Sequence, residues 1–297
     1  MPANPAARAP AGRAVRRRVL SQNFLIDTAV IDRLVRGSGV GEGDLVLDIG
    51  AGNGLITAAL AGHGARVVAI EQDPVLARRL RAKFAAAPGK LSDGVPTVVE
   101  GDVLTVALPR ESFRVVANLP FGITTKILHH LLDDPRGMLS RADVIVQAEV
   151  ARKRGTRGRG TLLNACWEPW FEFSTGPRIP PTAFRPRPRV DAAVLIIRSR
   201  EQPLLSAAVR PAYTEFVTGA FAGAHPTVAS ALSRVVPRSR FAELAGSLGF
   251  GIDALPSQLE AGHWVGLFQA TQSRRGEPGH GSGDTGVGAA GRRRNGR

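Results

Sequence analysis

The sequence contains a single cysteine, Cys166, among its 297 residues, which excludes an internal disulfide framework. The six histidines form no spacing with Cys166 that is typical of a metal site, so no metal is expected. No apolar run approaches the roughly 20 residues of a membrane helix, and the arginine-rich start lacks the apolar segment of a secretory signal. These absences predict a cytoplasmic protein with no membrane partner.

Acidic residues are scarce as well, because 25 aspartates and glutamates face 39 lysines and arginines, for a formal charge of +14. Arginine supplies nearly all of the positive charge, and it pairs with phosphate through two parallel hydrogen bonds. Nucleic acid is therefore the expected partner. Basic runs are often only solvated tails, so the charge indicates a class of partner and not an activity. The basic clusters occupy residues 13–18, 152–159 and 292–294.

Composition divides the chain into four parts. Residues 1–14 and 272–297 are rich in alanine, proline, glycine and arginine without an apolar period, and we expect both to be disordered. Within 15–203, apolar strand-like runs alternate with helical periods, which predicts a doubly wound α/β domain with a mostly parallel sheet. Within 204–271 only helical periods occur, which predicts a small all-helical domain.

The expected strands are residues 45–49, 66–71, 97–100, 113–117 and 143–147, with 170–173 and 192–197 as an edge hairpin that closes the sheet. The expected helices are residues 53–63, 74–86, 124–132, 213–221, 238–248 and 262–270. In such a sheet, ligands collect beyond the carboxyl ends of the strands, so the residues at those ends are the candidates for function.

Glycines follow the first of these strands, where the chain reads Asp48-Ile-Gly50-Ala-Gly52-Asn-Gly54. Glycine lets the backbone turn sharply and approach a ligand closely. The next strand ends in Glu71, 21 residues after Gly50, from which a carboxylate can accept hydrogen bonds from both hydroxyls of a ribose. A dinucleotide such as NAD would use the same two features.

Two further features favour S-adenosylmethionine over a dinucleotide. The glycines read GxGxG and lack the GxGxxG spacing that seats a pyrophosphate at a helix start. Asp102 ends the following strand, where its carboxylate can accept from the amino group of an adenine. By itself Asp102 could be a loop acid that caps its neighbours, but in combination with the glycines and Glu71 it fits an adenosyl group.

The segment Asn118-Leu119-Pro120-Phe121 comes directly after the fourth strand. The exocyclic amino group of a base is a poor nucleophile because its lone pair is delocalised into the ring. The side-chain oxygen of Asn118 and the carbonyl of Leu119 or Pro120 can accept its two hydrogens and draw the nitrogen toward tetrahedral geometry. Pro120 has no N–H and a fixed φ, and Phe121 offers a stacking face worth roughly 1–3 kcal/mol. The alternative is a helix that merely begins with these residues.

The chain resembles the rRNA adenine-N6 methyltransferases and, within them, the erythromycin-resistance (Erm) methylases of the actinomycete type. The first and last matching motifs are the specific ones, because other methyltransferases share the glycine loop but not both flanks. The motifs span roughly residues 15–271 and are "SQNFLID" at 21–27, "LDIGAGNG" at 47–54, "AIEQD" at 69–73, "GDVL" at 101–104, "NLPFGITT" at 118–125 and "PPTAFRPRPRVDAAVL" at 180–195.

The resemblance implies a class I, Rossmann-like methyltransferase fold with a mostly parallel seven-stranded sheet and a small helical C-terminal domain that binds RNA. It implies S-adenosylmethionine as cofactor, with Glu71 on the ribose and Asp102 on the adenine. The full set of cofactor-binding residues is Gln22, Asn23, Leu25, Gly50, Gly52, Glu71, Asp102 and Asn118.

For the target base, the resemblance implies that Asn118 and Phe121 hold one face and that Phe184 stacks on the other. Without it, Phe184 reads as a core residue. The following arginines alternate with prolines, which predicts a stiff arm with phosphate-binding heads that guides an extruded nucleotide. The base-binding and catalytic set is Asn118, Leu119, Pro120, Phe121 and Phe184, and the expected RNA-binding residues are Arg152, Lys153, Arg154, Arg157, Arg159, Arg185, Arg187 and Arg189.

Departures from the family pattern decide between its branches. Lys126 stands where the family usually has proline, and Phe121 replaces a common tyrosine. Asp191 and Ala192 follow the arm where the housekeeping small-subunit enzymes tend to have serine nearby. With the arginine-rich ends, this favours methylation of one adenine in 23S rRNA, in the loop that binds macrolides. The resemblance thus implies resistance to macrolides, lincosamides and streptogramins through a monomeric enzyme that acts on protein-free or precursor rRNA.

Three alternatives stay open at this point. A housekeeping 16S rRNA adenine dimethyltransferase would modify small-subunit RNA. A non-catalytic RNA-binding protein of the same fold would tolerate loss of Asn118. A dehydrogenase would be stabilised by NADH and not by S-adenosylmethionine.

Overall fold

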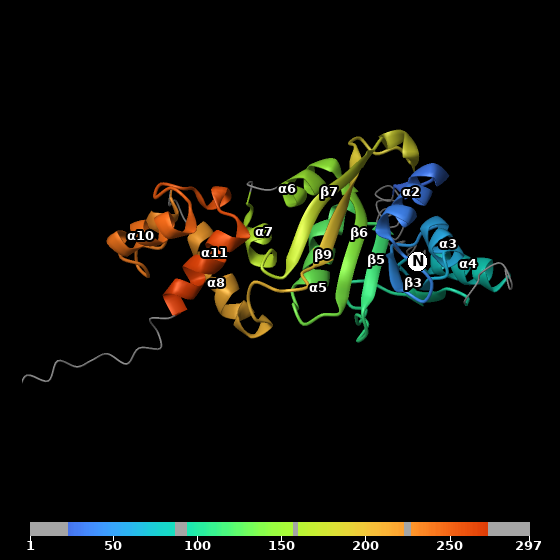
Figure 1. Ribbon diagram of the computed structural model, residues 1–297. Coiled ribbons are helices and arrows are strands. Elements are labelled where there is room, and N and C mark those ends of the chain that lie inside the picture. Colours follow the sequence, from blue (N-terminus) through green and yellow to red (C-terminus); the bar gives the residue numbers. More distant parts are fainter. Residues whose placement is uncertain (1–22, 87–93, 157–159, 223–226, 273–297) are drawn as a thin grey trace, which may run out of the picture.

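The computed structural model describes residues 23–86, 94–156, 160–222 and 227–272. Its centre is a seven-stranded sheet of order β4-β3-β2-β5-β6-β9-β7 (Figure 1). The first five strands in this order run parallel, and β9 is antiparallel to both of its neighbours. The mostly parallel sheet is therefore confirmed. The strands are β2 Leu45–Ile49, β3 Arg66–Glu71, β4 Thr97–Glu100, β5 Phe113–Asn118, β6 Leu139–Gln147, β7 Phe171–Ile179 and β9 Ala192–Ser199.

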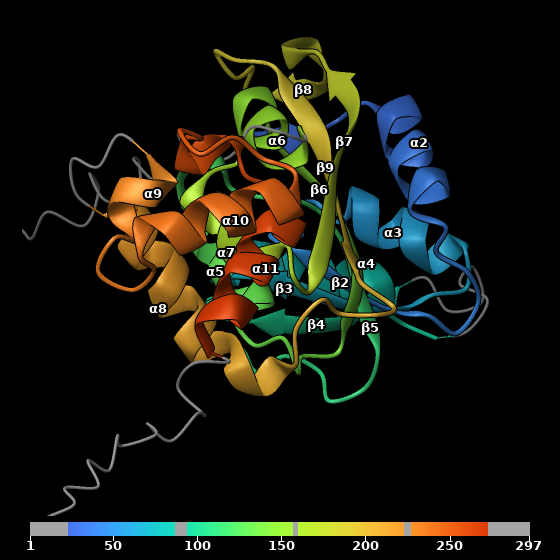
Figure 2. The same cartoon turned by 60° about the vertical axis from the view of Figure 1, so that its left-hand side comes forward.

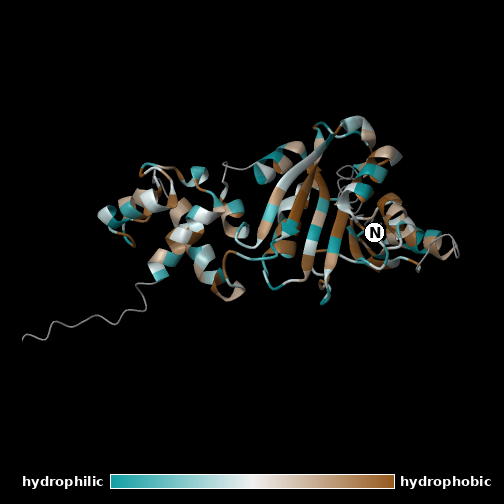
Figure 3. Cartoon of the chain, in the orientation of Figure 1, coloured by the Kyte–Doolittle hydropathy of each residue, from teal (hydrophilic) through white to brown (hydrophobic). Residues whose placement is uncertain are grey.

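Helices cover both faces of this sheet (Figures 1 and 2). Helices α2 (Thr28–Ser38), α3 (Leu55–Gly62) and α4 (Pro74–Ala85) lie on one face, and α5 (Thr124–Leu132) and α6 (Ala148–Gly155) on the other. Successive strand residues point to opposite faces, so Val46 packs with α2 and α3 while Leu47 packs with α5. Hydrophobic residues accordingly concentrate along the strands (Figure 3).

Helix α2 is fixed at both ends. The side chain of Asp27 accepts from the Val30 N–H at the start of the helix, at 3.1 Å. At its end, Arg141 of β6 donates to the Gly37 carbonyl at 2.7 Å, and Arg114 of β5 donates to the Ser38 carbonyl at 2.9 Å. Guanidinium groups stabilise the negative end of a helix dipole, so the two strands hold α2 in place.

A second, two-stranded sheet pairs β1 (Phe24–Leu25) with β8 (Phe184–Arg185) in antiparallel fashion. The expected strands do not include this pair, because two residues are too few to produce a periodic signal. The pairing brings the segment around Asn23 beside the start of the arginine-rich arm. It therefore joins the first and last specific motifs at the carboxyl edge of the main sheet.

Several boundaries differ from expectation. Strand β6 begins at Leu139 and not at residue 143, because Arg141 and Asp143 neutralise each other through two hydrogen bonds of 2.6 and 2.8 Å. Strand β7 extends to Ile179 and not to residue 173, through a Ser-Thr-Gly-Pro stretch that carries no apolar pattern. Helices α2, α6 and α7 (Leu162–Trp167) lie outside the expected elements.

The chain after β9 is helical in its described part, with α8 Arg210–Phe221, α9 Val228–Ala231, α10 Arg238–Leu248 and α11 Ala261–Gln272. Tyr213 and Trp264 are fully buried in its aromatic core. The Tyr213 hydroxyl donates to the Ala165 carbonyl of α7 at 2.9 Å, and Arg210 donates to the Leu132 carbonyl of α5 at 2.7 Å. These helices thus pack against α5 and α7, beside the sheet (Figure 1). Residue 204 as the domain boundary stays a prediction.

Within the described residues, no helix is long and apolar enough to cross a membrane. In the same part of the chain, no three histidine, cysteine or acidic side chains are grouped as metal ligands. Cys166 is buried, and burial raises the pKa of its thiol to about 11.

Candidate active site

The glycine loop after β2 passes close to two other segments of the chain. Gly50 and Gly52 have φ values of +72° and +55°, which other residues rarely adopt. A Cβ on Gly50 would lie 3.6 Å from Pro120, and one on Gly52 would lie 2.9 Å from the Phe24 ring. The loop therefore passes between β1 and the segment after β5, so that both flanking motifs converge on it.

Glu71 joins the end of β3 to this loop. It is 3% exposed, and its Oε2 accepts from the Gly52 N–H while its Oε1 accepts from the Asp73 N–H, each at 2.8 Å. Each carboxylate oxygen retains a second lone pair for a ligand hydroxyl. Glu71 lines a pocket together with Gly50 and Asn118, as the expected ribose-binding role requires.

Asn118, at the end of β5, is held in one orientation. Its Nδ2 donates to the Asn23 carbonyl at 2.8 Å. Its Oδ1 is buried and has no hydrogen-bond partner among the described residues. A buried acceptor without a partner costs free energy, about 1–3 kcal/mol, so it is a position where a donor from a ligand is favoured. Asn118 lines the pocket that also contains Gly50.

The two candidate backbone acceptors differ in availability. The Pro120 carbonyl accepts from the Ile123 N–H at 3.1 Å and from the Thr124 hydroxyl at 3.2 Å, within the turn that starts α5. The Leu119 carbonyl accepts no hydrogen bond from the described residues, while its N–H donates to Ile145 at 3.0 Å. Leu119 is thus the better acceptor for an incoming amino group.

Phe121 lines this pocket, and its ring contacts Phe184 behind it. Their ring centroids are 6.5 Å apart and their planes are inclined by 68°, which is an edge-to-face contact. Phe184 is 3% exposed and belongs to the apolar core. A purine stacked between two rings needs them nearly parallel, so the expected sandwich is not present in this conformation.

The remaining cofactor candidates are placed unevenly. Gln22 lies outside the described residues. The Leu25 side chain points into the core at 6% exposure, so any contact of Leu25 with a ligand uses its backbone. Asp102 is half-buried, does not line the pocket around Gly50, and caps the Leu104 N–H with its Oδ1 at 3.0 Å. Asp102 thus serves its own loop in this conformation.

The arm residues Arg185, Arg187 and Arg189 are exposed, and none forms an ion pair within the described residues. They start at β8, next to Phe184. Their guanidinium groups are therefore available to phosphates near the pocket.

The basic segment of α6 is less available. Arg152 forms two hydrogen bonds with Glu149 at 2.9 and 2.7 Å, and Lys153 lies 3.7 Å from the same carboxylate. Arg154 donates to Thr161 and Asn164, and burial lowers the pKa of its guanidinium. Because Arg154 is engaged in the interior, we omit it from the proposed RNA-binding set. Two further candidates, Arg157 and Arg159, lie outside the described residues.

Asp48 and Phe24 are two features of the site that the sequence analysis did not identify. Asp48 is 1% exposed and accepts from the Thr57 hydroxyl at 2.6 Å. Burial raises the pKa of Asp48 to about 7, against the opposing effect of the Thr57 hydrogen bonds, and the charge of Glu71 adds to the rise. Phe24 lines the pocket over Gly52. The aromatic residue inside "SQNFLID" was the available signal for Phe24.

Lys83, a third such feature, supports the loop from outside. Its Nζ donates to the carbonyls of Asn53 and Gly54 at 2.9 and 3.1 Å. These two bonds tie the end of the loop to α4. No motif spacing in the sequence indicates them, because Lys83 lies 29 residues from Gly54.

The sheet order, the glycine loop after its first strand and the acid at the end of the next strand define a class I, Rossmann-like methyltransferase. The family described as ribosomal RNA adenine dimethylase matches residues 14–272. The chain belongs to this family, whose members are methyltransferases that use S-adenosylmethionine.

Several named relatives are similar over most of the chain. The rRNA adenine N-6-methyltransferase of Aeromicrobium erythreum is 36% identical over 270 residues, which cover 90% of this chain and 77% of that protein. The mycinamicin-resistance protein MyrB of Micromonospora griseorubida is 37% identical, with coverage of 85% and 78%. The crystal structure of the 23S rRNA methyltransferase ErmE matches with a TM-score of 0.74 at 33% identity, over 84% of this chain and 100% of ErmE. The expected family and fold are confirmed.

Proposed function

We propose that this protein transfers a methyl group from S-adenosylmethionine to N6 of one adenine in 23S rRNA. The observation that carries the proposal is the buried Oδ1 atom of Asn118, which has no partner in the described residues and belongs to a residue that lines the pocket beside the glycine loop. An adenine N6 amino group is a hydrogen-bond donor of the required kind. The family and the relatives that methylate rRNA support the same reaction.

The pocket residues fit an adenosylmethionine cofactor. Gly50 and Gly52 allow close backbone approach, Glu71 keeps free lone pairs at the pocket wall, and Asn23 lines the same pocket. Glu71 would hold the ribose hydroxyls, and Asp102 would hold the adenine through Oδ2, since its Oδ1 caps Leu104. When bound, the cofactor supplies an electrophilic methyl group on a positively charged sulfur.

The protein activates the nucleophile by accepting its hydrogens. Asn118 Oδ1 takes one hydrogen of the N6 amino group, and the Leu119 carbonyl takes the other. The nitrogen lone pair is then withdrawn from the ring and directed at the methyl carbon. Bound S-adenosylmethionine would supply the methyl group and leave as S-adenosylhomocysteine, and the extra proton on N6 would pass to water. Alignment of these atoms supplies most of the acceleration, so a strong base is not required.

Phe121 supplies the stacking face for the purine. Phe184 would form the second wall after one of the two rings turns from the present angle of 68°. The exposed arm of Arg185, Arg187 and Arg189 binds the phosphates of the nucleotides on either side of the target. An adenine in a loop costs less to extrude than one in a duplex, so the substrate is a loop of protein-free or precursor rRNA.

We assign the large-subunit RNA because of the relatives. MyrB is named for resistance to mycinamicin, and ErmE is named as a 23S rRNA methyltransferase. Methylation of N6 adds bulk and removes a hydrogen-bond donor from the loop where macrolides, lincosamides and streptogramins bind. The proposed outcome for the host is resistance to these drugs, produced by a monomeric cytoplasmic enzyme.

The direct test uses labelled S-adenosylmethionine with protein-free 23S rRNA or 16S rRNA, followed by mapping of the modified base by reverse transcription and mass. We expect label at N6 of one adenine in 23S rRNA. Label in 16S rRNA would assign the housekeeping activity instead. Absence of label in both RNAs, with RNA binding intact, would support a non-catalytic protein of the same fold.

A further inference from the structure

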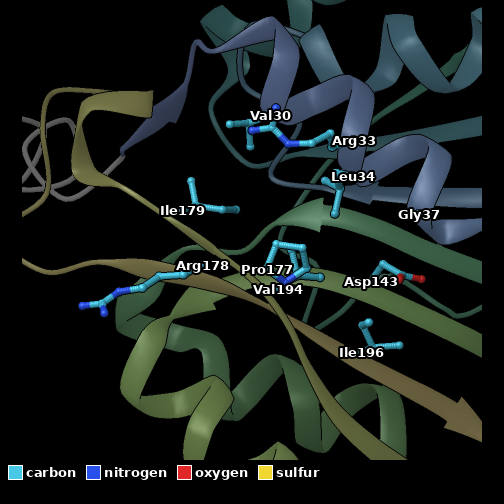
Figure 4. Close-up of a pocket in the computed structure, with 10 residues that line it drawn as sticks. All are labelled: Val30, Arg33, Leu34, Gly37, Asp143, Pro177, Arg178, Ile179, Val194 and Ile196. Carbon is cyan, nitrogen blue, oxygen red and sulfur yellow. The ribbon is translucent and has the colours of Figure 1, made fainter.

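A cavity of about 100 Å³ lies between α2 and the sheet, outside the pocket around Gly50. Figure 4 shows Val30 and Leu34 of α2 on one side, and Pro177, Ile179 and Val194 of β7 and β9 on the other. We call this cavity the α2–β7 slot. Its volume is below the roughly 150 Å³ of apolar cavities that bind benzene, so a ring enters the slot only in part and keeps its polar edge in solvent.

The rim of the α2–β7 slot is positively charged. Arg33 is exposed at the α2 rim and forms no ion pair or hydrogen bond with any described residue. Arg178, at the opposite rim, pairs with Asp191. Asp143 is the sole acid that lines the slot within the described chain, and its charge is neutralised by Arg141 through two hydrogen bonds. An apolar interior beside free guanidinium suits a flat ring that carries a phosphate.

The slot is linked to Phe184 through the apolar core. Its walls belong to the same apolar cluster as Phe184, and Phe121 packs against that cluster. Ile179 precedes Phe184 by five residues in the chain. The carbonyl of Ala183, between them, accepts from the N–H groups of Ile26 and Asp27 at the start of α2, at 2.9 and 3.3 Å. These contacts hold the slot and the arm in a fixed relation.

We propose that the α2–β7 slot binds the base of a nucleotide that flanks the target adenine, with the phosphate of that nucleotide on Arg33. The inference rests on the proposed RNA substrate. It makes the slot a determinant of sequence context, separate from the residues that hold the adenine itself. Burial of one face of a base against apolar side chains changes the affinity by a factor on the order of ten.

Gly37→Leu tests the slot. A Cβ on Gly37 meets no atom within 4 Å, and Gly37 lines the slot. A helical side chain leans toward the helix start, so leucine at this position extends over Arg33 and Leu34 and obstructs the slot. Leucine also favours a helix more than glycine does, so the variant is expected to fold. Gly62→Leu on α3 is the matched control, because Gly62 is equally exposed and unobstructed but does not line the slot.

The affinity of each protein is measured by fluorescence anisotropy for a 23S rRNA fragment with the target loop, and for copies with one abasic site at each flanking nucleotide. For wild type and Gly62→Leu, an abasic site at one flanking position should lower the RNA affinity about tenfold relative to the intact fragment. Gly37→Leu should bind the intact fragment about tenfold more weakly than wild type does. An abasic site at the same flanking position should not lower its RNA affinity further. The affinity for S-adenosylmethionine should be equal in all three proteins.

Arg33→Ala should weaken binding and reduce the salt dependence of the affinity by about one phosphate contact. Arg79→Ala on α4 is its control, since Arg79 is exposed and does not line the slot.

The proposal would be overturned if an abasic site lowered the RNA affinity of Gly37→Leu as much as it lowers that of wild type. So would an unchanged RNA affinity of Gly37→Leu combined with an altered oligomeric state in sedimentation, which would assign the slot to a contact between copies of the chain. Methylation of the fragment is followed in parallel. Normal methylation by wild type with an unchanged KM for Gly37→Leu contradicts the slot alone, whereas no methylation by wild type contradicts the proposed function and the slot with it.

Discussion

Asp48→Asn is expected to stabilise the protein at neutral pH. Asp48 is 1% exposed, and burial raises its pKa from 3.8 to about 7. The folded state therefore binds this proton more tightly than the unfolded state does. As the pH rises from about 4 to about 7, the unfolded state loses the proton first, and the stability of the wild type falls. A rise of about three in the pKa of Asp48 corresponds to at most about 4 kcal/mol of unfolding free energy. All of this contribution is lost above pH 7.

The assay is urea unfolding of wild type and Asp48→Asn at pH 5, 6, 7 and 8, with the difference in unfolding free energy plotted against pH. Subtraction removes the other titrating groups that both proteins share. The difference should grow with pH in favour of the variant and level off above pH 7. Thr57→Val is the companion variant: it removes the hydrogen bond that lowers the pKa, so its stability should keep falling beyond pH 7. A difference in unfolding free energy that stays constant from pH 5 to pH 8 would mean that folding does not raise the pKa of Asp48.

Three further predictions concern the site and its surroundings. Phe121→Ala should weaken RNA binding and leave the affinity for S-adenosylmethionine nearly intact in calorimetry; a large loss of cofactor binding would contradict its role as a stacking face. Replacement of Arg185, Arg187 and Arg189 by alanine should lower the RNA affinity and reduce its salt dependence by an amount that corresponds to up to three phosphate contacts. An unchanged salt dependence would show that the arm does not bind RNA phosphates. Arg154→Met should lower the unfolding free energy by about 1–3 kcal/mol in urea without changing that salt dependence, whereas a reduced salt dependence would return Arg154 to the RNA-binding set.

The fold was predictable from the sequence because its signals are local. Strands β2, β3 and β4 have the predicted bounds, since each is a short apolar run bounded by polar or glycine residues. The glycine loop was recognisable for the same reason: its φ values exclude most other residues. By contrast, β6 was too short in the prediction, because the Arg141–Asp143 pair that permits charge in a buried strand is visible only in three dimensions.

The site was predictable in its members but not in its connections. The convergence of Gly50 and Pro120 follows from the parallel sheet, which brings the carboxyl ends of β2 and β5 to one edge. The contacts of Asn23 with Asn118 could not be predicted, because they depend on the β1–β8 pair. Nor could the sequence distinguish the free carbonyl of Leu119 from its occupied neighbour, since a turn decides that difference.

The two arginine clusters illustrate the limit of charge as evidence. The arm and the α6 segment look alike in composition, and both were expected to bind RNA. In the structure the arm guanidinium groups are exposed, while Arg154 donates to Thr161 and Asn164 and lies over the Trp167 ring at 5.8 Å. Composition predicts that a protein binds a polyanion, but burial decides which residues can do so.

The role of Asn118 is measured by the single-turnover rate of methyl transfer to the target adenine in Asn118→Ala and Asn118→Asp, with cofactor and RNA affinities measured alongside. Alanine removes the acceptor and should lower the rate by a factor on the order of 10²–10³, while aspartate keeps an oxygen in the same place and should retain part of the activity. A near wild-type rate in Asn118→Ala would contradict the account, because the amino group would then be activated by something other than the unpaired oxygen of residue 118.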